Sequence, residues 1–195
     1  MATPGDPHHE HRLQALGASL AWKIADPTQD RHTLARSMLR KFLGAGAIFH
    51  AVCPLCGGSH GPVQARLPQG HAPLVSIAYS GPLVAVGVAP ATATAFGIDV
   101  EIDSGQQRRA VFEAIGSAEL RDWTRLEAVV KARRTGLRGE VRALDSFGDA
   151  REWIAPRESG LPELRGADIP LALPGEHVSA ILSVACAPVM PTVGA

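Results

Sequence analysis

The sequence of 195 residues has no excess of charge and no long hydrophobic run. Its 19 lysines and arginines balance 19 aspartates and glutamates, so the formal net charge is zero. Bulk electrostatic attraction to nucleic acid or to a membrane surface is therefore not indicated. No apolar run approaches the roughly 20 residues of a membrane-spanning helix, and the N-terminus lacks the basic and apolar segments of a signal peptide. These absences predict a cytoplasmic protein that binds neither nucleic acid nor membranes.

Cysteines and aromatic residues are also scarce. Three cysteines argue against a disulfide framework and for a reducing compartment. Cys53, Cys56 and His60 supply only part of the four ligands of a structural zinc site, and Cys186 is distant in sequence. Zinc therefore remains one interpretation of this run, beside buried thiols or a tight turn. A zinc-stabilised nucleic-acid-binding module is a poor hypothesis, because the chain has 5% aromatic residues and a single tyrosine.

Apolar periodicity predicts alternating strands and helices. Apolar residues recur at helical spacing over residues 31–43, and Gly44 is a typical residue to end that helix. Residues 74–80 and 83–89 are predicted to be strands joined by a turn at Gly81 and Pro82. A second helix is expected from about Ser117, with Gly136 ending it. Its predicted apolar stripe consists of Leu120, Trp123, Leu126 and Val130.

A weak internal repeat favours a duplicated architecture. The small-apolar segment over residues 83–90 ends in Val-Ala-Pro, and the segment over residues 177–188 ends in a similar way. Two halves that each close on such a strand predict a pseudo-duplicated α+β protein, divided near Ala95. Residues 1–20 are expected to form a mobile N-terminal tail, residues 21–95 one half and residues 96–195 the other.

Three carboxylates are predicted to gather between residues 96 and 131. In a strand over residues 96–102, Asp99 and Glu101 share one face while the isoleucines and valine face the core. Glu127 falls inside the apolar stripe of the second helix, with Lys131 one turn beyond it. Oxygen ligands of this kind suit a hard cation such as Mg²⁺. The alternative is an ordinary helical pair of Glu127 with Lys131 beside two solvated carboxylates on an edge strand.

The same residues carry a resemblance to a known family. Gly97-Ile-Asp99-Val-Glu101, followed by Trp123-x-x-x-Glu127-Ala-x-x-Lys131, resembles the motif pair of the 4′-phosphopantetheinyl transferases of the single-chain, surfactin-type group. The resemblance implies two similar lobes with the active site between them. It also implies transfer of the 4′-phosphopantetheine arm of coenzyme A to a serine of an acyl or peptidyl carrier protein, with Mg²⁺ or Mn²⁺ as cofactor and 3′,5′-ADP as the leaving group.

The resemblance also assigns roles to individual residues. Asp99, Glu101 and Glu127 would hold the metal, Glu127 would act as base and Lys131 would stabilise the departing phosphate. Residues implied to bind coenzyme A share a basic, hydroxyl or backbone group suited to phosphate; besides Lys131 they are Arg31, Arg36, Arg40, His60, Gly61, Tyr79 and Ser80.

Three positions depart from the family pattern. Pro62 stands where a lysine or arginine is usual, Tyr79 where a histidine is usual, and Leu126 where a lysine is usual. We therefore expect coenzyme binding that is weaker or differently arranged. The competing hypothesis is a degenerate relative that binds coenzyme A or a carrier protein without turnover. A monomer is expected in either case.

Overall fold

The computed structural model describes residues 10–53, 56–58, 61–103, 109, 113, 119–135, 151–158, 160–173 and 179–188. Within these ranges the chain has a mixed α+β fold with three antiparallel sheets, and two helices of more than one turn. The elements are β1 His11–Ala15, β2 Ala18–Ile24, α1 Arg31–Leu43, β3 Ile48–His50, β4 Gln64–Arg66, β5 Val75–Ser80, β6 Leu83–Val88, β7 Ala93–Ile102, α3 Leu120–Arg133, β8 Glu152–Ala155, β9 Leu164–Ala172 and β10 Ser179–Pro188.

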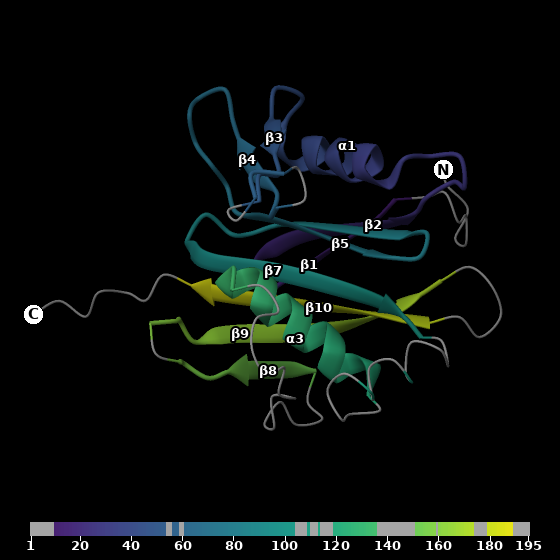
Figure 1. Cartoon of the computed structure of the whole chain (residues 1–195), viewed down its shortest axis with the longest axis vertical. Helices are drawn as coiled ribbons and strands as arrows, with labels where there is room; N and C mark the ends of the chain where they lie inside the picture. Colours follow the sequence, from purple (N-terminus) through teal and green to yellow (C-terminus); the bar gives the residue numbers. More distant parts are fainter. Residues whose placement is uncertain are drawn as a thin grey trace, which may run out of the picture.

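The first sheet has the strand order β1-β2-β6-β5, and α1 covers its outer face (Figure 1). The predicted bounds of α1 are confirmed at both ends. The Asp30 carboxylate accepts a hydrogen bond from the Thr33 backbone N–H at 2.8 Å, which caps the first turn. At the other end Gly44 adopts a φ of 92°, a conformation that glycine accepts readily. The predicted β5–β6 hairpin is also confirmed.

The second sheet has the order β7-β10-β9-β8, with α3 on its outer face (Figure 1). The two large sheets enclose the main core between them. Apolar side chains of both sheets meet there, including Leu20, Leu83, Ile98, Val100 and Leu182. Strand alternation then turns Gly97, Asp99 and Glu101 to the α3 side of β7, as the sequence predicted.

Both halves of the chain repeat one connection pattern. In the first, β2 leads to α1, and a later hairpin of β5 and β6 returns so that β6 pairs with β2. In the second, β7 leads to α3, and β9 and β10 return so that β10 pairs with β7. All of these pairings are antiparallel. The remaining pair, β3 with β4, forms a small separate sheet beside α1 (Figure 1).

Edges of the predicted halves and of the second helix need correction. Residues 11–15 and 18–20, assigned to the tail, lie in β1 and β2, because Leu13, Ala18 and Leu20 contribute to the main core. The second half begins with β7 at Ala93, two residues before the predicted division. Helix α3 begins at Leu120, with Glu119 rather than Ser117 as N-cap, and ends at Arg133. Its C-cap is Arg134 with φ 56°, not Gly136; Ser117 and Gly136 lie outside the described residues.

The apolar stripe predicted for α3 is also only part of its buried surface. Leu120 and Leu126 are buried and pack with the half-buried Trp123 and Val130 in a small cluster. A different set of small residues contacts the sheet, namely Ala128, Val129 and Ala132. Within the described residues, no helix combines the length and the apolar character needed to cross a lipid bilayer.

Candidate active site

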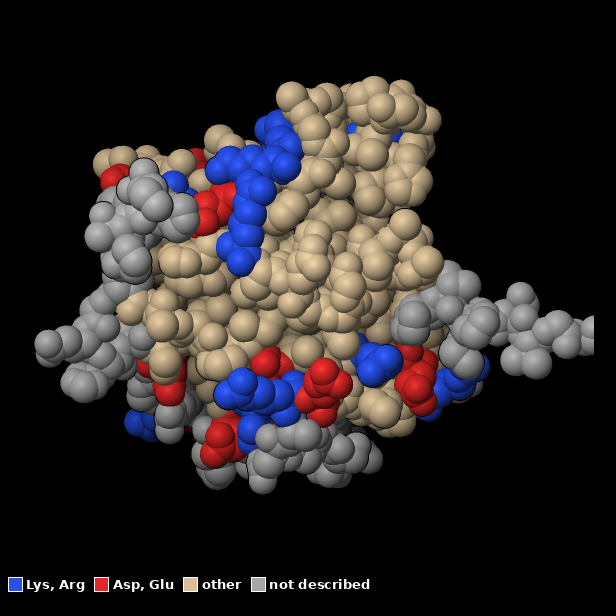
Figure 2. All heavy atoms as spheres, turned by 180° about the vertical axis from the view of Figure 1, so that it is seen from behind, with Lys and Arg blue, Asp and Glu red and all other residues tan. Residues whose placement is uncertain are grey.

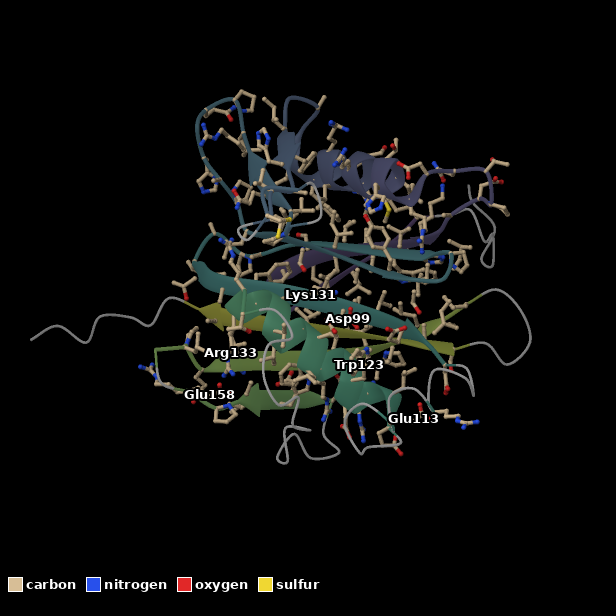
Figure 3. All side chains as sticks on the ribbon, in the orientation of Figure 1. Asp99, Glu113, Trp123, Lys131, Arg133 and Glu158 are labelled. Carbon is tan, nitrogen blue, oxygen red and sulfur yellow. The ribbon has the colours of Figure 1, made fainter. Side chains whose placement is uncertain are left out.

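Backbone contact between β7 and α3 places the acidic residues. A Cβ atom added at Gly97 would lie 2.2 Å from the Ala128 carbonyl oxygen and 2.5 Å from the Ala132 nitrogen. Only glycine therefore permits the helix to lie this close to the strand. Two residues further along β7, Asp99 comes within reach of Lys131 on α3 (Figure 3).

Asp99 is the most deeply buried acidic group of this site, with 5% of its surface exposed. Its Oδ1 accepts a hydrogen bond from the Lys131 ammonium at 2.6 Å. Its Oδ2 is buried and has no hydrogen-bond partner among the described residues. Burial raises the pKa of Asp99 from 3.8 to about 7; Lys131 opposes this increase, and the charges of Glu101 and Glu127 add to it. A buried carboxylate oxygen without a partner is costly unless a cation or a hydrogen-bond donor reaches it.

Glu101 lies two residues further along β7 and is half-buried. The Ser80 hydroxyl donates a hydrogen bond to Glu101 Oε2 at 2.6 Å. Burial raises the pKa of Glu101, whereas hydrogen bonds from Ser80 and Trp123 and the charge of Lys131 lower it; Glu127 raises it. Three carboxylates thus act on one another with Lys131 among them.

Carboxylate oxygens and net negative charge are the properties that a hard divalent cation requires. The buried Asp99 Oδ2 is the observation that fits such an ion. Within the described residues, however, no three acidic, histidine or cysteine side chains are gathered closely enough to hold a metal. Lys131 is the cation on Asp99 in this structure. To hold a metal here, Asp99 would have to release Lys131.

Serine side chains join the two large sheets beside this site. The Ser76 hydroxyl accepts a hydrogen bond from the Ile98 N–H at 3.1 Å, and the Ser80 hydroxyl accepts one from the Ile102 N–H at 3.0 Å. Strands β5 and β7 therefore lie edge to edge, and the acidic residues sit at the junction of the sheets. Among the described residues predicted to bind coenzyme A, Ser80 contacts Glu101 and Lys131 contacts Asp99.

Arg31 and Tyr79 form a separate group at the start of α1. The Arg31 guanidinium lies 5.5 Å from the centre of the Tyr79 ring and donates a hydrogen bond to the Gly81 carbonyl. The Tyr79 hydroxyl lies 3.2 Å from His32 Nδ1. Burial raises the pKa of Tyr79, while the charges of Arg31 and Arg36 lower it. Strand alternation places Tyr79 on the α1 side of β5, away from Ser80.

Other predicted coenzyme contacts lie elsewhere. The Arg40 guanidinium lies 5.3 Å from the ring centre of Phe49, on β3. Gly61 packs so tightly against Val52 that an added Cβ would lie 2.1 Å from its carbonyl oxygen. His60 lies outside the described residues. Cys53 is buried and Cys56 is exposed, and the Gly57 N–H donates a hydrogen bond to the Cys53 carbonyl at 2.9 Å.

A cavity of about 380 Å³ lies between the small β3–β4 sheet, the segment before β5 and the C-cap of α3. Its basic lining residues come from three separate segments and are His50, Arg66 and Arg134. The sequence analysis missed His50 and Arg66, because only the pairing of β3 with β4 and the position of α3 bring them together. Arg134 follows Lys131 by three residues, so the cavity adjoins the end of the helix that carries the acidic site's lysine.

The opposite side of the molecule carries a broad central area without charged side chains (Figure 2). Above it lies a group of basic side chains, and below it acidic and basic side chains alternate (Figure 2).

A buried polar group beneath α3 was also missed by the sequence analysis. Arg125 is fully buried and forms an ion pair with Asp168, whose carboxylate also accepts hydrogen bonds from Trp153 and Ser183. Helical geometry directs Arg125 away from the predicted apolar stripe. No local signal in the sequence links it to Asp168, which lies 43 residues away.

Comparison with models of known protein families gave no match, and comparison with curated proteins gave none. The resemblance to the 4′-phosphopantetheinyl transferases therefore rests on the motif residues of the sequence alone.

Proposed function

We propose that the protein transfers the 4′-phosphopantetheine arm of coenzyme A to a serine of an acyl or peptidyl carrier protein. The observation that carries this proposal is the acidic group on β7 and α3, in which Asp99 keeps one buried oxygen without a partner while Glu101 and Glu127 lie close enough to shift its pKa. Asp99, Glu101 and Glu127 would hold Mg²⁺ or Mn²⁺. The ion would neutralise charge on the coenzyme diphosphate.

The repeated connection pattern supports the same proposal at the level of the fold. Two halves with equivalent strand, helix and hairpin connections match the pseudo-duplicated, two-lobe architecture that the motifs imply. The acidic group lies at the junction of the two sheets. This is the position that an active site between lobes requires.

The side chains of this chain have distinct proposed roles in the transfer. A serine hydroxyl of the carrier attacks the β-phosphorus of coenzyme A, the bond from that phosphorus to the 3′,5′-ADP oxygen breaks, and the hydroxyl proton passes to Glu127 as general base. Lys131 leaves Asp99 and balances the negative charge that develops on the departing 3′,5′-ADP oxygen. The basic cavity of His50, Arg66 and Arg134 would receive the nucleotide end.

Intact-mass analysis of several apo carrier domains, incubated with the protein, coenzyme A and Mg²⁺, tests the proposal. We expect a gain of one phosphopantetheine arm, lost with EDTA and in the Asp99→Ala and Glu127→Ala variants. No gain with any carrier, combined with coenzyme-induced stabilisation, would instead support the binding protein without turnover. The specific observation in favour of that second candidate is the Lys131 ammonium, which already occupies Asp99 Oδ1 at 2.6 Å.

A serine pair offers an internal control for the acidic group. Both Ser80→Ala and Ser76→Ala remove the partner of a β7 backbone N–H, so each is expected to cost about 1–3 kcal/mol of stability in chemical denaturation. Only Ser80 also donates to Glu101. Ser80→Ala should therefore weaken Mn²⁺ binding measured by titration, while Ser76→Ala should not. Equal Mn²⁺ affinities in the two variants would contradict the role given to Glu101.

A further inference from the structure

Two ion pairs hold α3 on the second sheet, one on each side of Glu127. Asp99, Ser183 and Asp168 occupy facing positions on the adjacent strands β7, β10 and β9. Directly opposed residues of an antiparallel pair share a face, so these side chains form a row beneath the helix. Lys131 binds one end of the row and Arg125 binds the other. These two anchors are six residues apart, which is about 9 Å along a helix axis.

The anchor at Asp168 is buried and fully bonded. Arg125 donates from Nε and Nη2 to Asp168 Oδ2, at 2.7 Å and 2.6 Å, with side-chain exposures of 0% and 4%. Asp168 Oδ1 accepts from Trp153 Nε1 at 2.9 Å and from the Ser183 hydroxyl at 2.8 Å. The Thr124 hydroxyl on α3 lies 2.8 Å from the same Ser183 hydroxyl.

The remaining contacts of α3 define its position less sharply. Ala128 and Ala132 lie against Gly97 of β7, and this contact sets the distance between the helix and the strand. Arg133 pairs with Glu158, but the Glu158 side chain is 50% exposed, so water weakens that contact. A buried ion pair is weak evidence for stability, and its best-attested use is to specify one arrangement among several.

We propose that the Arg125–Asp168 pair is a positioning device that fixes the rotation and translation of α3, and thereby sets Glu127 and Lys131 over Asp99. Arg125 acts through the helix and touches neither substrate nor metal. The part of this inference that concerns the metal and the transfer reaction rests on the proposed function. The part that concerns the Lys131–Asp99 contact is independent of the proposed function.

Chemical labelling of lysine amines provides a readout that needs no activity. The chain has three lysines, and Lys23 and Lys41 serve as internal references for Lys131. Wild-type protein is compared with the double variant Arg125→Met/Asp168→Asn, which removes both buried charges and keeps an acceptor for Trp153 and Ser183. Arg133→Met is the matched control, because it removes a different arginine ion pair from the same helix. Thermal unfolding verifies that each variant is folded.

In the double variant we expect Lys131 to be labelled faster, while the labelling rates of Lys23 and Lys41 stay unchanged. We also expect Mn²⁺ to bind about 10- to 100-fold more weakly, as measured from the electron paramagnetic resonance signal of free Mn²⁺. Arg133→Met should leave both readouts at wild-type values. Unchanged labelling of Lys131 in the folded double variant, or an equal increase in Arg133→Met, overturns the inference. If the double variant does not fold, Arg125→Lys replaces it with the same outcomes, since lysine keeps the charge but not the planar fork.

Failure of the proposed function has a different signature. Wild-type protein that binds no Mn²⁺ and modifies no carrier would disprove the transferase proposal. Faster Lys131 labelling in the double variant would still support the positioning role of Arg125 and Asp168.

Discussion

Replacing Asp99 by asparagine is expected to stabilise the metal-free protein above pH 7 while reducing carrier modification by at least about 100-fold. The wild-type carboxyl has a pKa of about 7 in the folded protein and 3.8 as its ordinary value. A raised pKa means that the folded state binds the proton more tightly than the unfolded state does. Its contribution to stability is therefore full below pH 4 and is lost as the pH rises through about 7.

The amide carries no charge and avoids this loss, so the advantage of Asp99→Asn should amount to a few kcal/mol at pH 8 and vanish toward pH 4. Thermal unfolding in EDTA across this pH range measures the difference, and intact-mass analysis of the carrier measures activity. Added Mg²⁺ should stabilise wild-type protein and not the variant. A variant that is less stable than wild type at pH 8 in EDTA would contradict the assignment of Asp99 as a buried, incompletely compensated carboxylate.

Gly97→Ala is expected to be among the most damaging single substitutions in the chain. The new methyl group would meet two backbone atoms of α3, at 2.2 Å and 2.5 Å, and neither can move without displacing the helix. We expect a loss of about 3 kcal/mol or more in the free energy of unfolding, which is roughly 6–12 °C in melting temperature for a protein of this size. Carrier modification should fall with it, because α3 holds Glu127 and Lys131.

Gly70→Ala is the matched control for this substitution. Gly70 has a φ of +83° and no atom within 4 Å of an added Cβ, so alanine there experiences backbone strain without a collision. That strain should cost about 1–2 kcal/mol. A Gly97→Ala variant no less stable than Gly70→Ala would show that α3 can withdraw from β7 at little cost.

Features encoded by neighbouring residues were predictable from the sequence. The bounds of α1 follow from Asp30, Gly44 and the apolar spacing between them, all within one segment. The alternation of β7 likewise sets Asp99 and Glu101 opposite Ile98 and Val100. The β7 members of the acidic group depend on this alternation alone, and so they were predictable from a single strand.

Features that depend on distant partners were not predictable. Arg125 on a helix face away from an apolar stripe would ordinarily be solvated, and it is buried here because Asp168 and Trp153 meet it. The end of α3 at Arg134 escaped prediction for another reason. A positive φ is uncommon outside glycine, so the sequence pointed to Gly136; instead backbone bonds to the Lys131 and Val130 carbonyls hold the Arg134 turn.

The shared interior of the two large sheets has a mechanical consequence. Leu20 and Leu83 come from one repeat and Ile98 and Leu182 from the other, and all of them line a single apolar space. Neither half can move away from the other without exposing the apolar face of both sheets to water. Any larger change of shape at the acidic group must therefore come from its side chains, while the two sheets behave as one stiff frame.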